Sequence, residues 1–391
     1  MKVGIVGKPN VGKSTFFVAS TLAEAQIGNY PFTTIEANHG VAHVRVPDPG
    51  PLLGVTATPR TGKVIDGTRF VPVEIIDVAG LVPGAHEGRG LGNKFLSDLS
   101  RADVLVHVVD ASGQTDAEGN PATGHDPLED VAFLEIELDA WIGGLLLDGW
   151  EKVARRVKQE NRRIQTAITE KLQGIGISEA AVVAAIRHAG LQDAKPGDYD
   201  EPGILRLATE IRRAQKPLVI ALNKADVAGK ARIAELQAKI QAPSVPVCAQ
   251  AELALQKASQ AGAIKYHGDF EVVANLNPAQ QKGLDYIRDH VITPFGSTGI
   301  LEVLEHAVFQ HLGLVPVFPV EDETHFTDKE GRVLPDCHLV PPGTTARQLA
   351  YRVHTDLGDG FIRAVDCRSK RTVGADYVVQ AGDVLKIAAK A

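Results

Sequence analysis

Residues 7–15 read GKPNVGKST and follow the strand-like run KVGIV at residues 2–6. The next run, STFFVAST at residues 14–21, is compatible with a helix. Strand, glycine-rich loop and helix in this order are typical of a phosphate-binding loop. Gly7 and Gly12 let the backbone turn successive N–H groups inward, and the helix N-terminus adds partial positive charge. The sequence therefore predicts an α/β domain that binds phosphate groups at this loop.

Two side chains of the loop carry the expected chemistry. The ammonium group of Lys13 would reach the β- and γ-phosphates of a nucleotide, and the hydroxyl of Ser14 would be a ligand of Mg²⁺. Lys13 is therefore also a candidate catalytic residue. The residues predicted to form the phosphate cradle are Gly7, Pro9, Asn10, Val11, Gly12, Lys13, Ser14 and Thr15.

A second element follows in the run VEIIDVAGLV at residues 73–82. Its apolar strand ends at Asp77, whose carboxylate can hold the Mg²⁺ shell, while the N–H of Gly80 can sense the γ-phosphate during catalysis. Ras-like enzymes place a glutamine beside this glycine to orient the attacking water. Leu81 stands there instead and can neither donate nor accept a hydrogen bond, so we expect slow intrinsic hydrolysis.

A third element predicts which nucleotide base binds. The β-rich run PLVIAL at residues 217–222 ends in Asn223, Lys224, Ala225 and Asp226, the pattern NKxD. The carboxylate of Asp226 can accept hydrogen bonds from N1–H and the 2-amino group of guanine, whereas adenine would leave it desolvated and unpaired. Asn223 would tie this loop to the phosphate loop, and the stem of Lys224 would lie over the purine. The pattern therefore favours GTP.

Taken together, these motifs resemble those of the Obg-related GTPases, in particular the archaeal members close to the YchF group. The resemblance includes NYPFTTIEANHG at residues 29–40 and the long string from Asp77 to Ser112. It extends to LPDCHLVPPGTTARQLAYRVHTDLGDGF at residues 334–361, which is similar to the small TGS domain of these proteins. It implies GTP and GDP as ligands, Mg²⁺ as cofactor, and the ribosome or translation-associated RNA as partner.

The resemblance also carries residue assignments. Thr34, with Thr33 as the alternative, is the candidate switch threonine that closes on Mg²⁺ and the γ-phosphate. Cys248 and Ala249 fall where related GTPases carry a Ser-Ala pair whose backbone N–H meets guanine O6. Asn10 stands where similar GTPases hold a K⁺ ion, although it could instead only brace the loop.

One difference from the YchF group bears on the base. YchF proteins usually replace the guanine-specifying aspartate with glutamate and favour ATP, whereas this chain keeps Asp226. The resemblance therefore supports GTP here.

An inserted helical module is expected at residues 126–210. Asp126 and Pro127 suit the start of a helix, Ser178 is a good cap for a helix at 178–189, and a helix is expected at 204–215 after a loop at 193–203. Residues 151–171 predict one amphipathic helix whose basic face either is merely solvated or contacts RNA. The basic residues of this segment are Lys152, Arg155, Arg156, Lys158, Arg162, Arg163 and Lys171, and its acidic residues are Glu151, Glu160 and Glu170.

The segment at 241–255 predicts a strand followed by a loop, and a helix at 300–313 would close the GTPase core. From residue 314 onward, short strand-like runs surround one helix that Thr344 or Thr345 caps and Gly358 ends. The runs are VPVFPV, HLV, FIRAVD, VVQ and VLKIA. This order suits a β-grasp domain over residues 314–391, which either binds RNA or is a general docking module.

Composition agrees with a multidomain protein. The chain has 391 residues, a net charge of −7 and 44% hydrophobic residues, which suits two or three domains with substantial cores. Neither a membrane-spanning run nor a leader is expected, which predicts a cytoplasmic location. Cys248, Cys337 and Cys367 are widely spaced and indicate neither a disulfide framework nor a zinc site.

The predicted architecture is a P-loop GTPase with a mostly parallel sheet, divided into residues 1–125 and 211–313 by the helical module and followed by the TGS-like domain. The predicted function is hydrolysis of GTP to GDP and phosphate as a conformational switch on ribosomes or RNA. Two alternatives stay open: a nucleotide-regulated binding protein with incidental hydrolysis, and a YchF-type ATPase.

Overall fold

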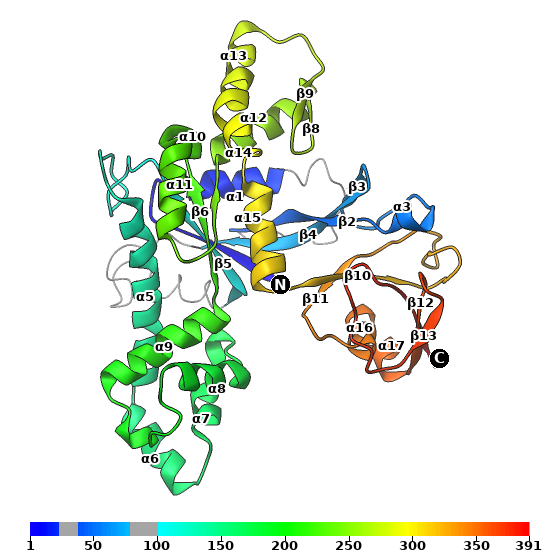
Figure 1. Ribbon diagram of the computed structural model, residues 1–391. Helices are drawn as coiled ribbons and strands as arrows, with labels where there is room; N and C mark the ends of the chain where they lie inside the picture. The colour runs from blue at the N-terminus through cyan, green and yellow to red at the C-terminus, as the bar shows by residue number, and fades with distance from the viewer. Residues whose placement is uncertain (23–37, 79–100, 391) are drawn as a thin grey trace. The chain divides into compact units, whose positions relative to one another are not determined.

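The computed structural model describes residues 1–22, 38–78 and 101–390 (Figure 1). By its internal contacts the chain divides into two compact units. The first combines Met1–Ala19, Asn38–Gly40 and Glu74–Val303, and the second combines Ser20–Ala37, Val41–Val73 and Leu304–Ala391. Within the described residues, no helix combines the length and the apolar character that a membrane span requires. The finer four-part division expected from the sequence stays a prediction.

A seven-stranded sheet has the order β2-β4-β1-β5-β6-β7, with β3 paired to β4. The pairs β1–β4, β1–β5, β5–β6 and β6–β7 are parallel, as expected. The strands are β1 (Lys2–Val6), β2 (His39–Pro47), β3 (Lys63–Ile65), β4 (Thr68–Asp77), β5 (Val104–Asp110), β6 (Leu218–Asn223) and β7 (Ser244–Pro246).

The central strands explain where a ligand can bind. Every residue of β5 and β6 is buried, which fits their apolar sequences VLVHVVD and LVIALN in a sheet covered on both faces. Their register pairs Asp110 with Asn223 at the carboxyl ends. In open α/β sheets the binding crevice lies outside these ends, so the polar residues that close the strands are brought together there.

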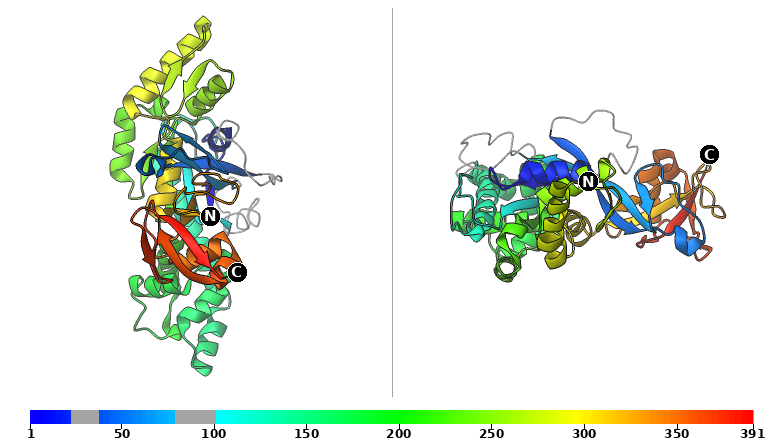
Figure 2. Two further views of the ribbon diagram at one scale, coloured as in Figure 1. Left: turned by 90° about the vertical axis from the view of Figure 1, so that its right-hand side faces the viewer. Right: turned by 90° about the horizontal axis from the view of Figure 1, so that it is seen from above.

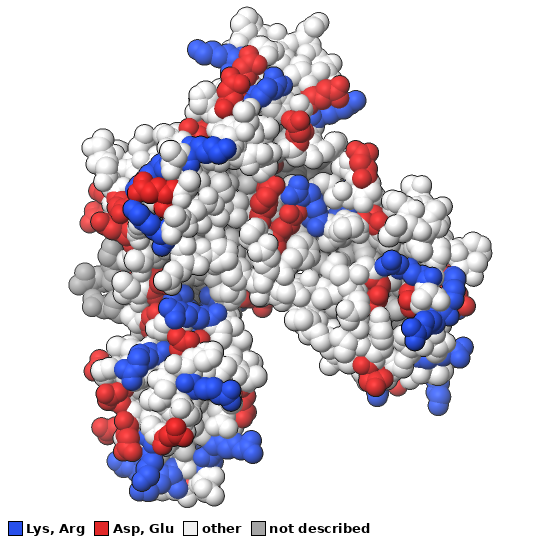
Figure 3. Space-filling view, in the orientation of Figure 1, with Lys and Arg blue, Asp and Glu red and all other residues white. Residues whose placement is uncertain are grey.

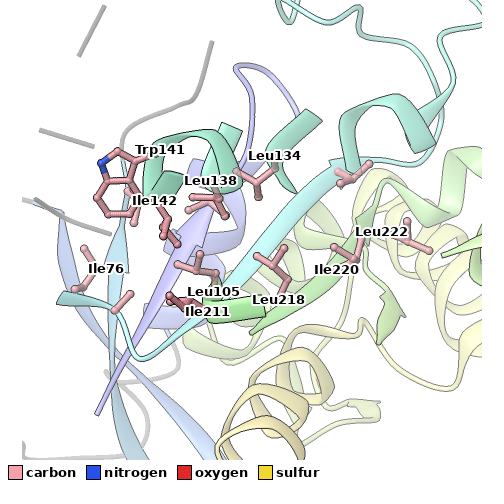
Figure 4. Packing of buried hydrophobic residues seen from close by; sticks show 14 of the residues in the cluster. Ile76, Leu105, Leu134, Leu138, Trp141, Ile142, Ile211, Leu218, Ile220 and Leu222 are labelled. Carbon is pink, nitrogen blue, oxygen red and sulfur yellow. The ribbon is translucent and has the colours of Figure 1, made fainter. Parts of the chain in front are cut away.

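Helices pack on this sheet through one continuous apolar core. Figure 4 shows Leu134 and Leu138 above Leu105 of β5 and Leu218 of β6, with Ile211 beside them; all five belong to one buried cluster. Outside the helical module, the other helices and strands of the first unit are α1 (Lys13–Leu22), α10 (Ala225–Ala228), α11 (Lys230–Lys239), α12 (Ala249–Gln260), β8 (Ile264–Tyr266), β9 (Phe270–Val272), α13 (Pro278–Ile287), η4 (Arg288–Ile292), α14 (Thr293–Phe295) and α15 (Ile300–Glu305). The last residues of α1 and of α15 belong to the second unit.

The helical module is present in the first unit. Its helices are α5 (Pro127–Leu147), α6 (Trp150–Gln159), α7 (Ile164–Lys171), η2 (Gln173–Ile175), α8 (Glu179–His188), η3 (Pro196–Asp198) and α9 (Glu201–Gln215). Asp126 and Ser178 cap α5 and α8 as expected, by accepting from Leu128 N and Ala181 N. Figures 1 and 2 show this module and the α13 region at opposite ends of the first unit.

Two expectations for the module were wrong. Residues 151–171 form two helices rather than one, because the chain turns at Asn161, which has a left-handed φ of 51°. Asparagine tolerates this conformation, and the apolar spacing stretches to seven residues between Val157 and Ile164 at the same place. The expected loop at 193–203 is also shorter, because Asp200 caps α9 by accepting from Gly203 N.

The second unit contains a five-stranded sheet of order β11-β10-β14-β12-β13. Its core packs Val317, Val340, Leu349, Val379 and Leu385 together. Besides β3 and most of β2 and β4, the described residues of this unit form α3 (Gly50–Leu53), η5 (His306–His311), β10 (Val315–Val320), β11 (His338–Val340), α16 (Ala346–Val353), α17 (Thr355–Asp359), β12 (Phe361–Asp366), β13 (Arg371–Val373) and β14 (Val384–Ala389). Strands around a capped helix agree with the expected β-grasp domain.

Details of this domain differ from the expectation. Thr345 caps α16 in a reciprocal capping box with Gln348, but the helix stops at His354, whose extended φ of −162° separates α16 from α17. Gly358 therefore lies inside α17 instead of ending a single helix. The run VVQ at 378–380 is not a strand, while Arg371–Val373 is one.

The segment Val41–Val73 is tied to the C-terminal part of the second unit by polar contacts. Arg69, which is 1% exposed, donates from Nη1 to Leu334 O at 2.6 Å and from Nη2 to Pro335 O at 2.9 Å. Arg45 donates to the carboxylate of Glu305 from Nε at 2.7 Å, from Nη2 at 3.0 Å and from its backbone N–H at 3.1 Å. This polar joint was not foreseen from the sequence.

Candidate nucleotide site

The glycine-rich loop lies between β1 and α1 and has the backbone that glycine permits. Gly12 has a φ of 93°, and a Cβ there would lie 2.3 Å from Nδ2 of Asn223. No larger residue fits at this point, so the loop and the NKAD segment touch at Gly12 itself. Ser14 is exposed in the first turn of α1, and Thr15 is half-buried. A hydroxyl in that position is accessible to a ligand at the helix N-terminus.

Lys13, the first residue of α1, and Asp77, the last residue of β4, form an ion pair between Nζ and Oδ1. The register of β1 and β4 places Ile5 opposite Asp77, which explains how a loop residue reaches a strand residue 64 positions away. The two side chains keep 13% and 20% of their surface exposed, respectively. The lysine and the carboxylate therefore meet where phosphate and Mg²⁺ would bind.

The NKAD segment is held by hydrogen bonds from both sides. Asn223 donates from Nδ2 to Val11 O at 2.8 Å and accepts from Ala249 N at its Oδ1 at 3.1 Å. Lys224 adopts a left-handed φ of 59° and donates from Nζ to Asp110 Oδ2 at 2.7 Å. Asn223 thus connects the phosphate loop to the start of α12.

Asp110 anchors this arrangement, although sequence reasoning did not single it out. Its buried carboxylate accepts from Lys224 Nζ, from Ser112 Oγ at 2.5 Å and from Thr115 Oγ1 at 3.0 Å. Burial raises the pKa of Asp110, but these hydrogen bonds, that of Lys224 first, outweigh it and leave the pKa below its ordinary value. An aspartate at the end of a largely apolar strand, VLVHVVD, is the signal that could have found it.

The phosphate loop is also attached to the segment that follows β5. Lys8 is buried, donates to Thr115 O at 3.0 Å and pairs with Asp130 of α5 at 2.6 Å. Asn10 donates from Nδ2 to Gly119 O at 2.9 Å. The side chain of Asn10 therefore braces the loop, while its Oδ1 is the atom that a cation would use.

Cys248 and Ala249 differ from the expected arrangement. The chain after β7 is not a loop, because α12 begins at Ala249. Cys248 N donates to Thr298 O at 2.9 Å, and Ala249 N donates to Asn223 Oδ1. Both amides thus have protein acceptors, so a contact with guanine O6 would have to share them. Burial, followed by the charge of Asp226, raises the pKa of the Cys248 thiol to about 12, which makes it a poor nucleophile.

Some expected site residues lie outside the described residues, namely Thr33, Thr34, Gly80 and Leu81. In the described part of the chain, the cysteines are free, and no group of three His, Cys, Asp or Glu side chains could hold a metal ion. Oxygen donors alone suit Mg²⁺, which needs only one or two protein ligands beside phosphate. Ser14 and Asp77 fit that requirement.

Three family models match the chain. Residues 2–132 match 50S ribosome-binding GTPase, residues 221–322 match the G4 motif-containing domain of the YGR210-like Obg-like GTPases, and residues 324–389 match the TGS domain.

Relatives match over the whole chain. The GTP-binding protein MJ1332 of Methanocaldococcus jannaschii is 49% identical, with 100% of this chain and 99% of that protein covered. The ribosome-binding ATPase YchF of Haemophilus influenzae is 29% identical, with 98% of each covered. A crystal structure of a GTP-binding protein from Pyrococcus horikoshii is 41% identical over 100% of both chains, with a TM-score of 0.81. These matches bear out the expected resemblance and the domain types.

Proposed function

Because this chain belongs to the Obg-related GTPases, we propose that it binds GTP selectively, hydrolyses it to GDP and phosphate, and switches conformation on ribosomes or translation-associated RNA in the cytoplasm. The observation that supports this most is the fixed NKAD segment. Asn223 and Lys224 are each hydrogen-bonded to a different part of the fold, so Asp226 is presented from a braced turn. Preorganised acceptors discriminate between bases without reorganisation.

Selectivity for guanine follows from the charge of Asp226. A guanine supplies two donors to the carboxylate, whereas an adenine would bury it without donors, which costs roughly 1–3 kcal/mol or more for a charged group. The relatives named as ATPases are 29% identical to this chain. An ATPase of that type is the alternative, and it predicts equal or tighter binding of ATP.

The proposed hydrolysis uses the residues at the carboxyl ends of β1 and β4. Lys13 would leave Asp77 for the β- and γ-phosphates, because a phosphate carries more charge than one carboxylate. Ser14 and the freed Asp77 would then hold Mg²⁺, which supplies charge neutralisation on the phosphates. Thr34 and Gly80 stay proposed partners for the γ-phosphate. With Leu81 in place of glutamine, turnover should be slow without a partner.

A K⁺ ion is proposed at Asn10. Its Nδ2 is already committed to Gly119 O, so Oδ1 is the atom left for a cation near the phosphates. Such a cation would supply positive charge between the β- and γ-phosphates.

Contact with RNA is proposed for the exposed face of α6 and the turn after it. Lys152, Arg155, Lys158 and Arg163 are exposed and have no ion pair to any described residue, whereas Arg156 pairs with Glu160 and Arg162 pairs with Glu170. Figure 3 shows Lys and Arg side chains gathered over this end of the helical module. Unpaired surface cations are the groups that bind phosphates. The β-grasp domain is a second candidate reader of RNA.

The test is steady-state hydrolysis of GTP and ATP with and without purified ribosomes, with Lys13→Ala as the inactive control. We expect slow GTP turnover that ribosomes stimulate. A nucleotide-regulated binding protein with incidental hydrolysis would bind GTP but show no stimulation. Faster ATP than GTP turnover would instead support the ATPase alternative.

A further inference from the structure

A tyrosine outside every nucleotide-binding motif contacts the aspartate assigned to the base. Tyr286 on α13 donates from Oη to Asp226 Oδ2 at 3.2 Å, across 60 positions of sequence. Its side chain is 43% exposed, so it lies at the surface rather than in the core. Exposed tyrosines usually need no partner, and a bond to this particular carboxylate therefore requires an explanation.

The position of the tyrosine ring is restrained from its own helix. His290, one turn further along in η4, stacks on Tyr286 with ring centroids 4.3 Å apart and planes 12° from parallel. The Nδ1 of His290 also lies 3.2 Å from the backbone oxygen of Tyr286. Stacking of this kind fixes a side chain that would otherwise rotate freely at the surface. The hydroxyl is thus held in place at Asp226.

A carboxylate can accept this bond and still read guanine. Its two oxygens offer about four acceptor positions, and guanine uses two of them. A hydroxyl that donates to an ionised carboxylate restrains the rotation of that carboxylate, and at 3.2 Å this bond is long for an O–H donor, so its effect is modest. Asp226 sits in the short helix α10, and the side chain of Cys248 also interacts with its carboxylate, so Tyr286 acts together with that thiol.

We propose that Tyr286 is a positioning residue for base selection, which acts by holding the Asp226 carboxylate toward the N1 and 2-amino edge of guanine. The inference rests on the proposed guanine selectivity and adds the residue that enforces it. Because adenine makes no favourable bond with Asp226, the tyrosine hydroxyl should affect guanine nucleotides and leave adenine nucleotides unchanged.

The experiment is calorimetric titration of GTP and ATP into the full-length wild-type protein and Tyr286→Phe, which keeps the ring and its stack on His290. We expect GTP affinity to fall about threefold to tenfold, as for loss of one ordinary hydrogen bond, with ATP affinity unchanged. In an Asp226→Ala background the same substitution should have almost no further effect, because its partner is absent.

The matched control is Tyr351→Phe, which removes a similar bond from Tyr351 Oη to Asp359 at 2.7 Å in the second unit and should leave both affinities unchanged. Equal losses for GTP and ATP, or an unchanged GTP affinity, would overturn the inference while selectivity through Asp226 stands. A wild-type protein that does not prefer GTP over ATP would overturn both this inference and the proposed function.

Discussion

Lys224 Nζ and Asp110 Oδ2 form an ion pair 2.7 Å long in which the carboxylate side chain is fully buried and the lysine is 30% exposed. The pair links the carboxyl end of β5 to the NKAD segment after β6. The purine would lie over the stem of Lys224, so the buried carboxylate of Asp110 would hold in place a side chain that contacts the ligand. Removing its charge should therefore affect both folding and binding.

Asp110→Asn should lower the free energy of unfolding by about 1–3 kcal/mol at neutral pH, because a buried charged partner of Lys224 is lost. It should also weaken GTP binding. Urea denaturation and titration calorimetry measure the two effects, with Asp193→Asn at an exposed site as control. An unchanged stability would contradict the anchoring role.

The same variant predicts a pH dependence. Since the folded-state pKa of Asp110 lies below its ordinary value of 3.8, its contribution is present above that value and is lost as pH falls through the lowered pKa. The stability difference between wild type and Asp110→Asn should thus be constant at neutral pH and shrink below pH 3.8. A difference that grows on acidification would have the wrong sign.

The RNA prediction uses the unpaired cations of α6 and the following turn. Changing Lys152, Arg155, Lys158 and Arg163 to Glu should weaken ribosome association and flatten its salt dependence, by about 0.7–0.9 in the log–log slope for each phosphate that the protein no longer neutralises. Nucleotide binding should persist. The control reverses an equal charge at the exposed Lys230, Lys257, Lys265 and Lys282. If the variant co-sediments with ribosomes as the wild type does at every salt concentration, this face is merely solvated.

Asn10 predicts a dependence on monovalent cations. GTP turnover should be faster in K⁺ than in Na⁺ at equal ionic strength, and Asn10→Ala should remove the difference, because Oδ1 would no longer ligate the ion. A side chain that only braces Gly119 predicts something else: the variant would lose the same fraction of its rate in both salts. Low and identical wild-type rates in K⁺ and Na⁺ would reject the K⁺ site.

The strands and caps could be predicted because each depends on neighbouring residues. Apolar runs closed by Asn223 or by Asp77 indicate strands of a parallel sheet, and Asp126 and Ser178 are caps by their own chemistry. The break at Asn161 was missed because an amphipathic pattern survives a turn between two helices. Likewise, nothing local marks His354 as the end of α16.

The contacts that anchor the site could not be predicted, for a different reason, although the place of Asp110 at the end of a buried strand marks that residue. Tyr286 reaches Asp226 only through the packing of α13, and Asp110 meets Lys224 only once β5 and β6 are in register. Such pairs depend on tertiary contacts between positions far apart in sequence, so spacing carries no trace of them. The motifs therefore predict the residues that would contact the ligand, whereas the contacts that hold these residues in place are visible only in the structure.

The most direct test of the account is competition binding of GTP, ATP and xanthosine triphosphate to wild type and Asp226→Asn. Wild type should prefer GTP, whereas the variant should lose GTP affinity and prefer xanthosine triphosphate, because its amide donates where the carboxylate accepted. A wild-type protein that binds ATP as tightly as GTP, or an unchanged preference in Asp226→Asn, would contradict the claim that this carboxylate selects guanine.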